Sequence, residues 1–338
     1  MRTSDLYDRL LEAVLDLAWG QWTAMGVAGA RSSQRMIIDP EALTLATLAV
    51  GRSDARLFDE MLDWVAVNSR LLDMARLRRL GKRASAEQRR LLGAVAEVAA
   101  LHAEGPGAKR LGWASVLAEE APAAYGGEPL FRSEREGAAG WTGTDDLFER
   151  AGFLRSSPDL RGMSREPDAS RQACVRFRAR ALVGTSARAE VLTYLWTHEW
   201  AHGRLIAERA AYNQAPVAEV LSELAAAKLA ETRSDGRKTL YRLAAQLRAV
   251  GSPEPAYADW ARAWPALVAV LDGLRPSGLS DDAAWMRLAQ VLVSQRDGLE
   301  SEGLEADIGD LSGWADRGPQ ILAEAIGAVV ASVQRAAE

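Results

Sequence analysis

The sequence predicts a mainly α-helical protein with a small strand-bearing unit near its middle. Apolar residues recur every three or four positions through most of the 338-residue chain, which is the spacing of one helix face. Between residues 187 and 243, three such helical stripes are followed by a stretch in which apolar and polar residues alternate, as they do in strands. We therefore expect a helical N-terminal domain (1–102), a linker-rich segment (103–144), a central unit (145–250) and a helical C-terminal domain (251–338).

The three helical stripes of the central unit each supply one side of a small core. They consist of Val191, Leu192 and Leu195, of Leu205, Ile206 and Ala210, and of Val217, Val220, Leu221 and Leu224. Asn213 stands where its side chain can cap the third helix, and Pro216 falls in the first turn, where a missing amide is tolerated. Two strands, 229–233 and 238–243, flank an Asp235-Gly236 pair that favours a tight hairpin turn.

This order of three short helices and a hairpin resembles the winged helix-turn-helix of ArsR- and MarR-type regulators. The matching positions are the small Ala207, the apolar Val217 and Val220/Leu221, and the Arg-Ser-Asp-Gly-Arg-Lys hairpin before Tyr241. The resemblance implies a transcriptional regulator that binds double-stranded DNA. We expect it to act as a homodimer and to need no metal or other cofactor.

In that family the third helix enters the major groove and the hairpin, or wing, touches phosphates. The resemblance places Gln214, Ala218 and Ser222 at the bases and Arg233, Arg237 and Lys238 at the phosphates, and Arg204 and Asn213 complete the implied DNA-binding set. One departure is that the third helix carries Glu219 and Glu223. Phosphates repel these carboxylates unless they turn away or accept from a cytosine amine.

A rival motif lies in the same stretch. His198-Glu199-Trp200-Ala201-His202 matches H-E-x-x-H, in which two histidines one helical turn apart bind zinc and the glutamate activates water for peptide hydrolysis. Arg204 stands where zinc peptidases have an apolar residue, and a third ligand would have to be a carboxylate such as Glu219 or Glu223. We therefore expect no catalytic residue and no metal site, and a zinc metallopeptidase is the less favoured alternative.

Eleven tryptophans are many for this length, and we expect most of them to pack in cores and interfaces. They also suggest the main alternative function. As a protein-partner module, for example the neutralising member of a defence or toxin–antitoxin pair, the chain would use its tryptophan-rich helices as an interface.

Charge is distributed unevenly along the chain. Residues 150–250 hold 17 Lys/Arg and 10 Asp/Glu, a net charge of +7. The whole chain has a net charge of −5, so the residues outside this range carry −12. Such asymmetry suggests a surface that meets an anion. The arginines just ahead of the first central helix strengthen that interpretation: Arg161, Arg165, Arg171, Arg176, Arg178 and Arg180.

The flanking segments are expected to be helical at 4–24, 40–50, 54–68 and 71–80, from residue 86, and at 260–274, 281–299 and 318–333. Asp39 is expected to cap the second of these helices, and Ser85 with Gln88 the fifth. A short helix at 113–120 is expected within the linker, and 171–183 is expected to be either strand or helix. The single Cys174 excludes an internal disulfide and is expected in a core. No apolar run reaches 18 residues, and residues 1–22 do not show the signal-peptide order of charge, apolar core and cleavage site. We therefore expect a cytoplasmic location without membrane contact.

Overall fold

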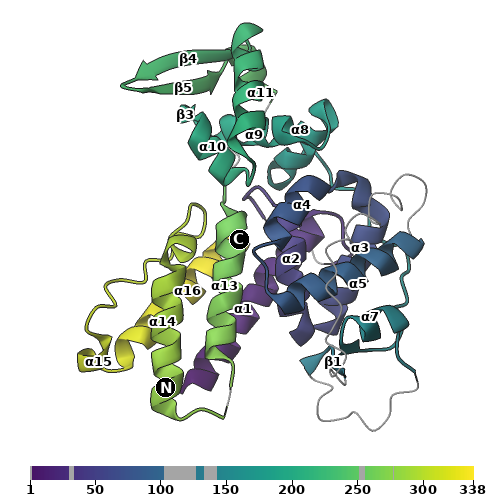
Figure 1. Cartoon of the computed structure of the whole chain (residues 1–338), viewed down its shortest axis with the longest axis vertical. Coiled ribbons are helices and arrows are strands. Elements are labelled where there is room, and N and C mark those ends of the chain that lie inside the picture. The colour runs from purple at the N-terminus through teal and green to yellow at the C-terminus, as the bar shows by residue number, and fades with distance from the viewer. Residues whose placement is uncertain (1, 30–33, 103–126, 133–142, 251–255, 277) are drawn as a thin grey trace.

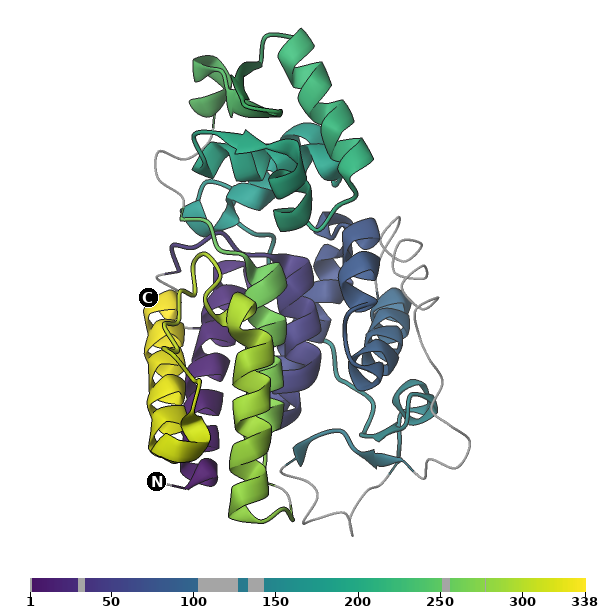
Figure 2. The same ribbon diagram turned by 60° about the vertical axis from the view of Figure 1, so that its left-hand side comes forward.

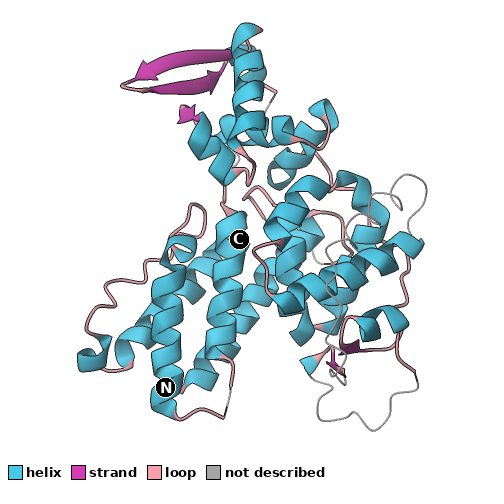
Figure 3. Cartoon of the chain, in the orientation of Figure 1, coloured by secondary structure: helices cyan, strands magenta, loops and turns pink. Residues whose placement is uncertain are grey.

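The computed structural model describes residues 2–29, 34–102, 127–132, 143–250, 256–276 and 278–338. It confirms a mainly helical chain with a small three-stranded antiparallel sheet between residues 201 and 243 (Figures 1 and 3). None of the helices in these ranges combines the length and the apolar character that crossing a bilayer requires. We refer to residues 175–250, at the top of Figure 1, as the head and to the other described residues as the body.

The first half of the body is a set of packed helices. They are α1 (Thr3–Ala24), α2 (Pro40–Val50), α3 (Ala55–Asn68), α4 (Met74–Gly81), α5 (Ala86–His102) and α7 (Asp146–Arg150), with 3-10 turns at Gly51–Ser53, Ser69–Leu71 and Gln172–Cys174. The helix predicted at 71–80 starts later, at Met74, because Asp73 caps it by accepting from the Arg76 amide at 3.0 Å.

Two of these helices begin where the sequence predicts. The Asp39 side chain accepts from the Ala42 amide at 3.0 Å, so α2 is capped as expected. Before α5, the amides of Ser85 and Gln88 each donate to the other residue's side chain at 3.1 Å, which is a reciprocal capping box.

The second half of the body is formed by the C-terminal helices. These are α13 (Trp260–Leu274), α14 (Asp281–Leu299), α15 (Trp314–Arg317) and α16 (Gln320–Ala337). The bounds predicted for α13 and α14 are confirmed. One apolar cluster contains Leu10 of α1, Leu267 of α13 and Ile326 of α16, and Figure 2 shows α16 beside α1. The two terminal helical segments therefore share a single hydrophobic core.

The segment before the head departs from the prediction. Glu128–Pro129 (β1) pairs in parallel with Phe153–Leu154 (β2) where a linker is expected. The helix expected at 113–120 lies outside the described residues. Residues 175–183, where either strand or helix is expected, form a helix, α8 (Val175–Val183). Cys174 is buried as expected, and burial raises its thiol pKa to about 12.

The head has its own sheet and core. Its elements after α8 are α9 (Ala187–Thr197), β3 (Ala201–His202), α10 (Gly203–Arg209), α11 (Gln214–Ala226), β4 (Ala230–Asp235), β5 (Lys238–Leu243) and α12 (Ala245–Arg248). The antiparallel strand order is β3-β5-β4, with Tyr241 paired to Ala201 on one side and to Thr232 on the other. The apolar core contains residues of all three predicted stripes and also Ile37 and Tyr257 of the body. Its least exposed stripe residues, at most 1% exposed, are Val191, Leu195, Ile206, Val217 and Leu221.

Candidate nucleic-acid interface

Helix α11 has one buried and one open face. Val217, Leu221 and Leu224 are buried in the head core. Gln214, Ala218 and Ser222 follow one another at intervals of four residues and are all exposed, so they form one stripe along the outer side of the helix. The three residues that the resemblance assigns to bases therefore share an accessible face.

The β4–β5 hairpin ends in a tight turn with two exposed basic residues beside it. Asp235 pairs with Lys238, so Gly236 and Arg237 alone make the turn. Gly236 has φ +57°, and glycine at the first central position is typical of a type II′ turn. The sequence predicts that Asp235 is part of the turn, but Asp235 belongs to β4. Arg237 and Lys238 are exposed, and neither makes an ion pair within the described part of the chain.

Arg233 lies further back on the same hairpin and has an aromatic partner. Its guanidinium carbon is 4.6 Å from the ring centroid of Trp200, and the Arg242 guanidinium lies at the same distance from that ring. Arg242 also donates to Glu199 at 3.1 Å and to Glu231 at 2.6 Å. The sequence does not predict the contact between Trp200 and Arg242, because the strand that brings them together, β3, is only two residues long.

Arg204 and Asn213 are the two remaining residues of the predicted DNA-binding set. Arg204 is exposed in the first turn of α10, on a different helix from the α11 stripe. Asn213 occupies the cap position of α11 with extended backbone (φ −69°, ψ 153°), but its side chain makes no capping hydrogen bond. The predicted side-chain cap is therefore wrong. Asn213 remains exposed at the start of the α11 stripe.

Both glutamates of α11 are exposed beside the stripe. Glu223 forms an ion pair with Arg188 of α9, and both side chains are about half exposed. This pairing places a positive charge beside one of the two carboxylates that phosphate would repel.

Arg161 and Arg165 of the predicted arginine cluster are exposed, but the three arginines on α8 do not form the basic surface that the composition suggests. Arg176 is 2% exposed and Arg180 is 4% exposed, and both side chains are held inside the protein. Arg178 donates to the backbone carbonyls of Ala169 and Ser170, each at 2.9 Å. As support for an anion-binding surface, the predicted cluster is therefore wrong at these three residues. Helix α8 turns Arg176 and Arg180 into the protein, and the nearby backbone holds Arg178.

Those buried arginines belong to an ion-pair network between head and body. Arg180 donates to both oxygens of Glu41 at 2.8 Å and to Glu190 at 2.9 Å. Arg176 pairs with Glu190 and donates to the Ile38 carbonyl at 3.0 Å. Helix α8 of the head is thus joined to α2 of the body by charges that water does not reach.

Arg76 extends the network to the turn before α11. It pairs with Asp39 and Glu41 and donates to the Ala210 carbonyl at 2.8 Å. Burial alone would raise the pKa of Asp39, but Arg76 and Arg176 outweigh that effect and hold this pKa below its ordinary value. The network therefore keeps Asp39 ionised and fixes the head against the body.

The His198–His202 motif does not adopt the geometry of a zinc-binding helix. His198 ends α9 with extended backbone (φ −121°, ψ 135°), and His202 precedes α10 with φ −92° and ψ 150°. The His198 Nε2 lies 3.0 Å from Glu302 of the body, and the His202 Nδ1 accepts from the Leu205 amide at 3.1 Å. Across the described ranges, no three His, Cys, Asp or Glu side chains gather into a group that could hold a metal ion.

No protein-family model, curated protein or solved structure matches this chain. The head is therefore interpreted from its geometry and from the arrangement of its exposed residues.

Proposed function

We propose that the chain is a DNA-binding transcriptional regulator whose head is a winged helix-turn-helix of the ArsR and MarR type. In this proposal α10 and α11 are the helix-turn-helix and the β4–β5 hairpin is the wing. One observation carries it: the order α9-β3-α10-α11-β4-β5 presents an open helix face and a basic hairpin tip together, at the end of the molecule away from the body (Figure 1). A helix and a projecting hairpin can contact one duplex at the same time.

The outer stripe of α11 suits the major groove, which is wide enough to admit a helix. The Gln214 amide can pair with adenine, the Ser222 hydroxyl can donate or accept, and the Ala218 methyl can contact the methyl group of thymine. Glu219 can accept from a cytosine amine. These four exposed residues would supply base choice.

The wing would supply position on the duplex. Arg237 and Lys238 at the hairpin tip are available for phosphate contacts, which fix register without reading sequence. Arg233 presents one guanidinium face to Trp200, and its N–H groups, which lie at the edge of the guanidinium, remain suited to phosphate. Stacking holds this side chain in one direction, so less rotamer entropy is lost on binding.

The proposal includes a homodimer that binds a two-fold DNA site. The body offers an apolar surface for this contact on α14, where Met286 is 50% and Val293 58% exposed beside Trp314. The same surface favours the alternative function, a protein-partner module. Light scattering of a Met286→Lys/Val293→Lys variant distinguishes the two. Conversion from dimer to monomer supports self-association through this surface, and an unchanged mass shows that this surface does not form the dimer contact.

The DNA-binding proposal is tested by titrating the full chain against its own upstream DNA and a random duplex across a salt series. Each phosphate contact releases counterions, so the logarithm of affinity falls linearly with the logarithm of salt concentration. For Arg237→Ala/Lys238→Ala we expect a slope smaller by about two and weaker binding to both duplexes.

The matched control removes two positive charges from the body. Lys82 and Arg161 are both exposed, so Lys82→Ala/Arg161→Ala changes net charge equally and should leave the slope unchanged. A slope reduced equally in both variants would show only a general effect of charge. No binding to either duplex at low salt would refute the proposed function.

A further inference from the structure

A cavity of about 370 Å³ lies in the body between α2, the start of α5 and α13. Its volume falls within the range of about 300–1,000 Å³ that small-molecule sites occupy. The cavity lies where N-terminal and C-terminal helices of the body meet, and neither the head nor the ion-pair network contributes to its lining.

The walls of the cavity are mainly apolar, but one buried donor is left over. Leu45, Leu80 and Val268 line it together with the ring of Trp264. Trp264 is 1% exposed, yet its indole N–H has no hydrogen-bond partner among the described residues. An unpaired buried donor is costly and uncommon in native proteins. This unpaired donor therefore indicates a ligand that supplies a hydrogen-bond acceptor.

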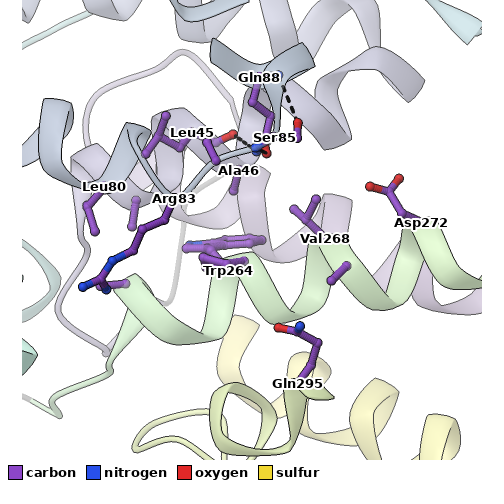
Figure 4. A pocket seen from close by; sticks show the side chains of 15 residues that line it. Leu45, Ala46, Leu80, Arg83, Ser85, Gln88, Trp264, Val268, Asp272 and Gln295 are labelled. Carbon is purple, nitrogen blue, oxygen red and sulfur yellow. Dashed lines mark hydrogen bonds between the residues drawn. The ribbon is translucent and has the colours of Figure 1, made fainter. Parts of the chain in front are cut away.

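The charged side chains of the cavity stand at opposite ends, as Figure 4 shows. Arg83 lies at one end, and within the described residues its guanidinium makes no hydrogen bond or ion pair. Asp272 lies at the other end, where it pairs with Arg275. The unused positive charge is thus at one end only, and it would orient an anionic ligand.

We propose that this cavity binds a small organic monocarboxylate. The apolar body of the ligand packs against Trp264 and Val268, and its carboxylate takes Arg83 and the Trp264 N–H as donors. The proposal does not depend on the proposed function, because the cavity lies in the body and is tested without DNA.

The chemistry is tested by calorimetric titration of the full chain with 4-phenylbutyrate, octanoate and 2-naphthoate. The matched neutral probe for the first acid is 4-phenylbutyramide. We expect one acid to bind with one molecule per chain, and its affinity to fall at least about tenfold in Arg83→Ala, because a charge-assisted hydrogen bond is lost. The neighbouring Lys82 is exposed but does not line the cavity, so Lys82→Ala should bind normally.

The location is tested by filling the cavity and by observing its tryptophan. Ala269 is a half-buried lining residue, so Ala269→Leu should abolish binding, whereas Ala284→Leu on α14, away from the cavity, should not. In ¹⁵N-tryptophan-labelled protein, the Trp264 indole resonance should shift on addition of the acid. Trp264→Phe identifies that resonance by its disappearance from the spectrum of the free protein.

Three results would overturn the proposal. Equal affinity for 4-phenylbutyrate and its amide would show that the carboxylate is not recognised. Binding that survives Ala269→Leu with a stationary Trp264 resonance would place the ligand elsewhere. If none of the three acids binds at millimolar concentration, the cavity does not bind small organic monocarboxylates. Melting curves of each variant exclude misfolding as the cause of a loss.

Discussion

The arginines of the head–body junction and those of the hairpin belong to the same charge-rich stretch of sequence but have opposite environments. Arg176 and Arg180 are buried and each is paired with a carboxylate. Arg237 and Lys238 are exposed, and neither forms an ion pair within the described residues. Charge at the junction is used to hold two parts of the chain together, whereas charge at the hairpin tip is free for a partner. A count of basic residues cannot separate these two uses.

The largest expected effect of a substitution is at Arg76, at the centre of the junction. Arg76→Met leaves the buried Asp39 with only the more distant Arg176 and removes one of the two arginines at Glu41. Removal of one member of a buried ion pair costs about 3–5 kcal/mol. We expect a loss of this size in the free energy of unfolding, measured with urea. As a control, Arg296→Met breaks the surface pair with Glu300, which should cost at most about 1 kcal/mol. Similar losses in both variants would contradict a distinct role for burial.

Acid should weaken the junction through protonation of Asp39. The native pKa of Asp39 lies below its ordinary value, so its ionised form stabilises the fold at neutral pH. This contribution is complete above about pH 4 and is lost as pH falls from there through the lower native pKa. Thermal midpoints measured between about pH 2 and 6 should therefore fall more steeply for wild type than for Asp39→Asn. Parallel curves would assign the acid sensitivity to other groups, and the exposed Asp297→Asn serves as the control.

The same comparison explains how far the sequence alone could go. The bounds of α13 and α14 and the core of the head follow from apolar spacing within each segment, which a sequence displays directly. The partners of Arg176 and Arg180 do not, because Asp39 and Glu41 lie far earlier in the chain and meet α8 only after folding. Strand β3 was missed for a related reason, since two residues are too few to show alternation and its pairing with Tyr241 is not local.

On the hairpin, a modest effect is expected at Arg233, whose guanidinium faces Trp200. A cation–π contact at a partly exposed site contributes about 0.5–1 kcal/mol, so Arg233→Ala should lower the free energy of unfolding by that amount. Arg204→Ala, at an exposed position on α10, provides the matched loss of one arginine and should have no measurable effect on urea unfolding. If the two variants unfold alike, the stacking does not contribute to stability.

The smallest effect on stability is expected at the hairpin tip. Arg237→Ala/Lys238→Ala removes two exposed side chains that hold nothing in place, so the free energy of unfolding should change by at most about 0.5 kcal/mol. The same variant is expected to weaken DNA binding and flatten its salt dependence, because the charges that do not support the fold are those available to phosphate. Together these two measurements test the separation of roles between junction and hairpin. A tip variant that loses stability as well as affinity would show that these residues support the fold, and its weaker DNA binding could then no longer be attributed to lost phosphate contacts.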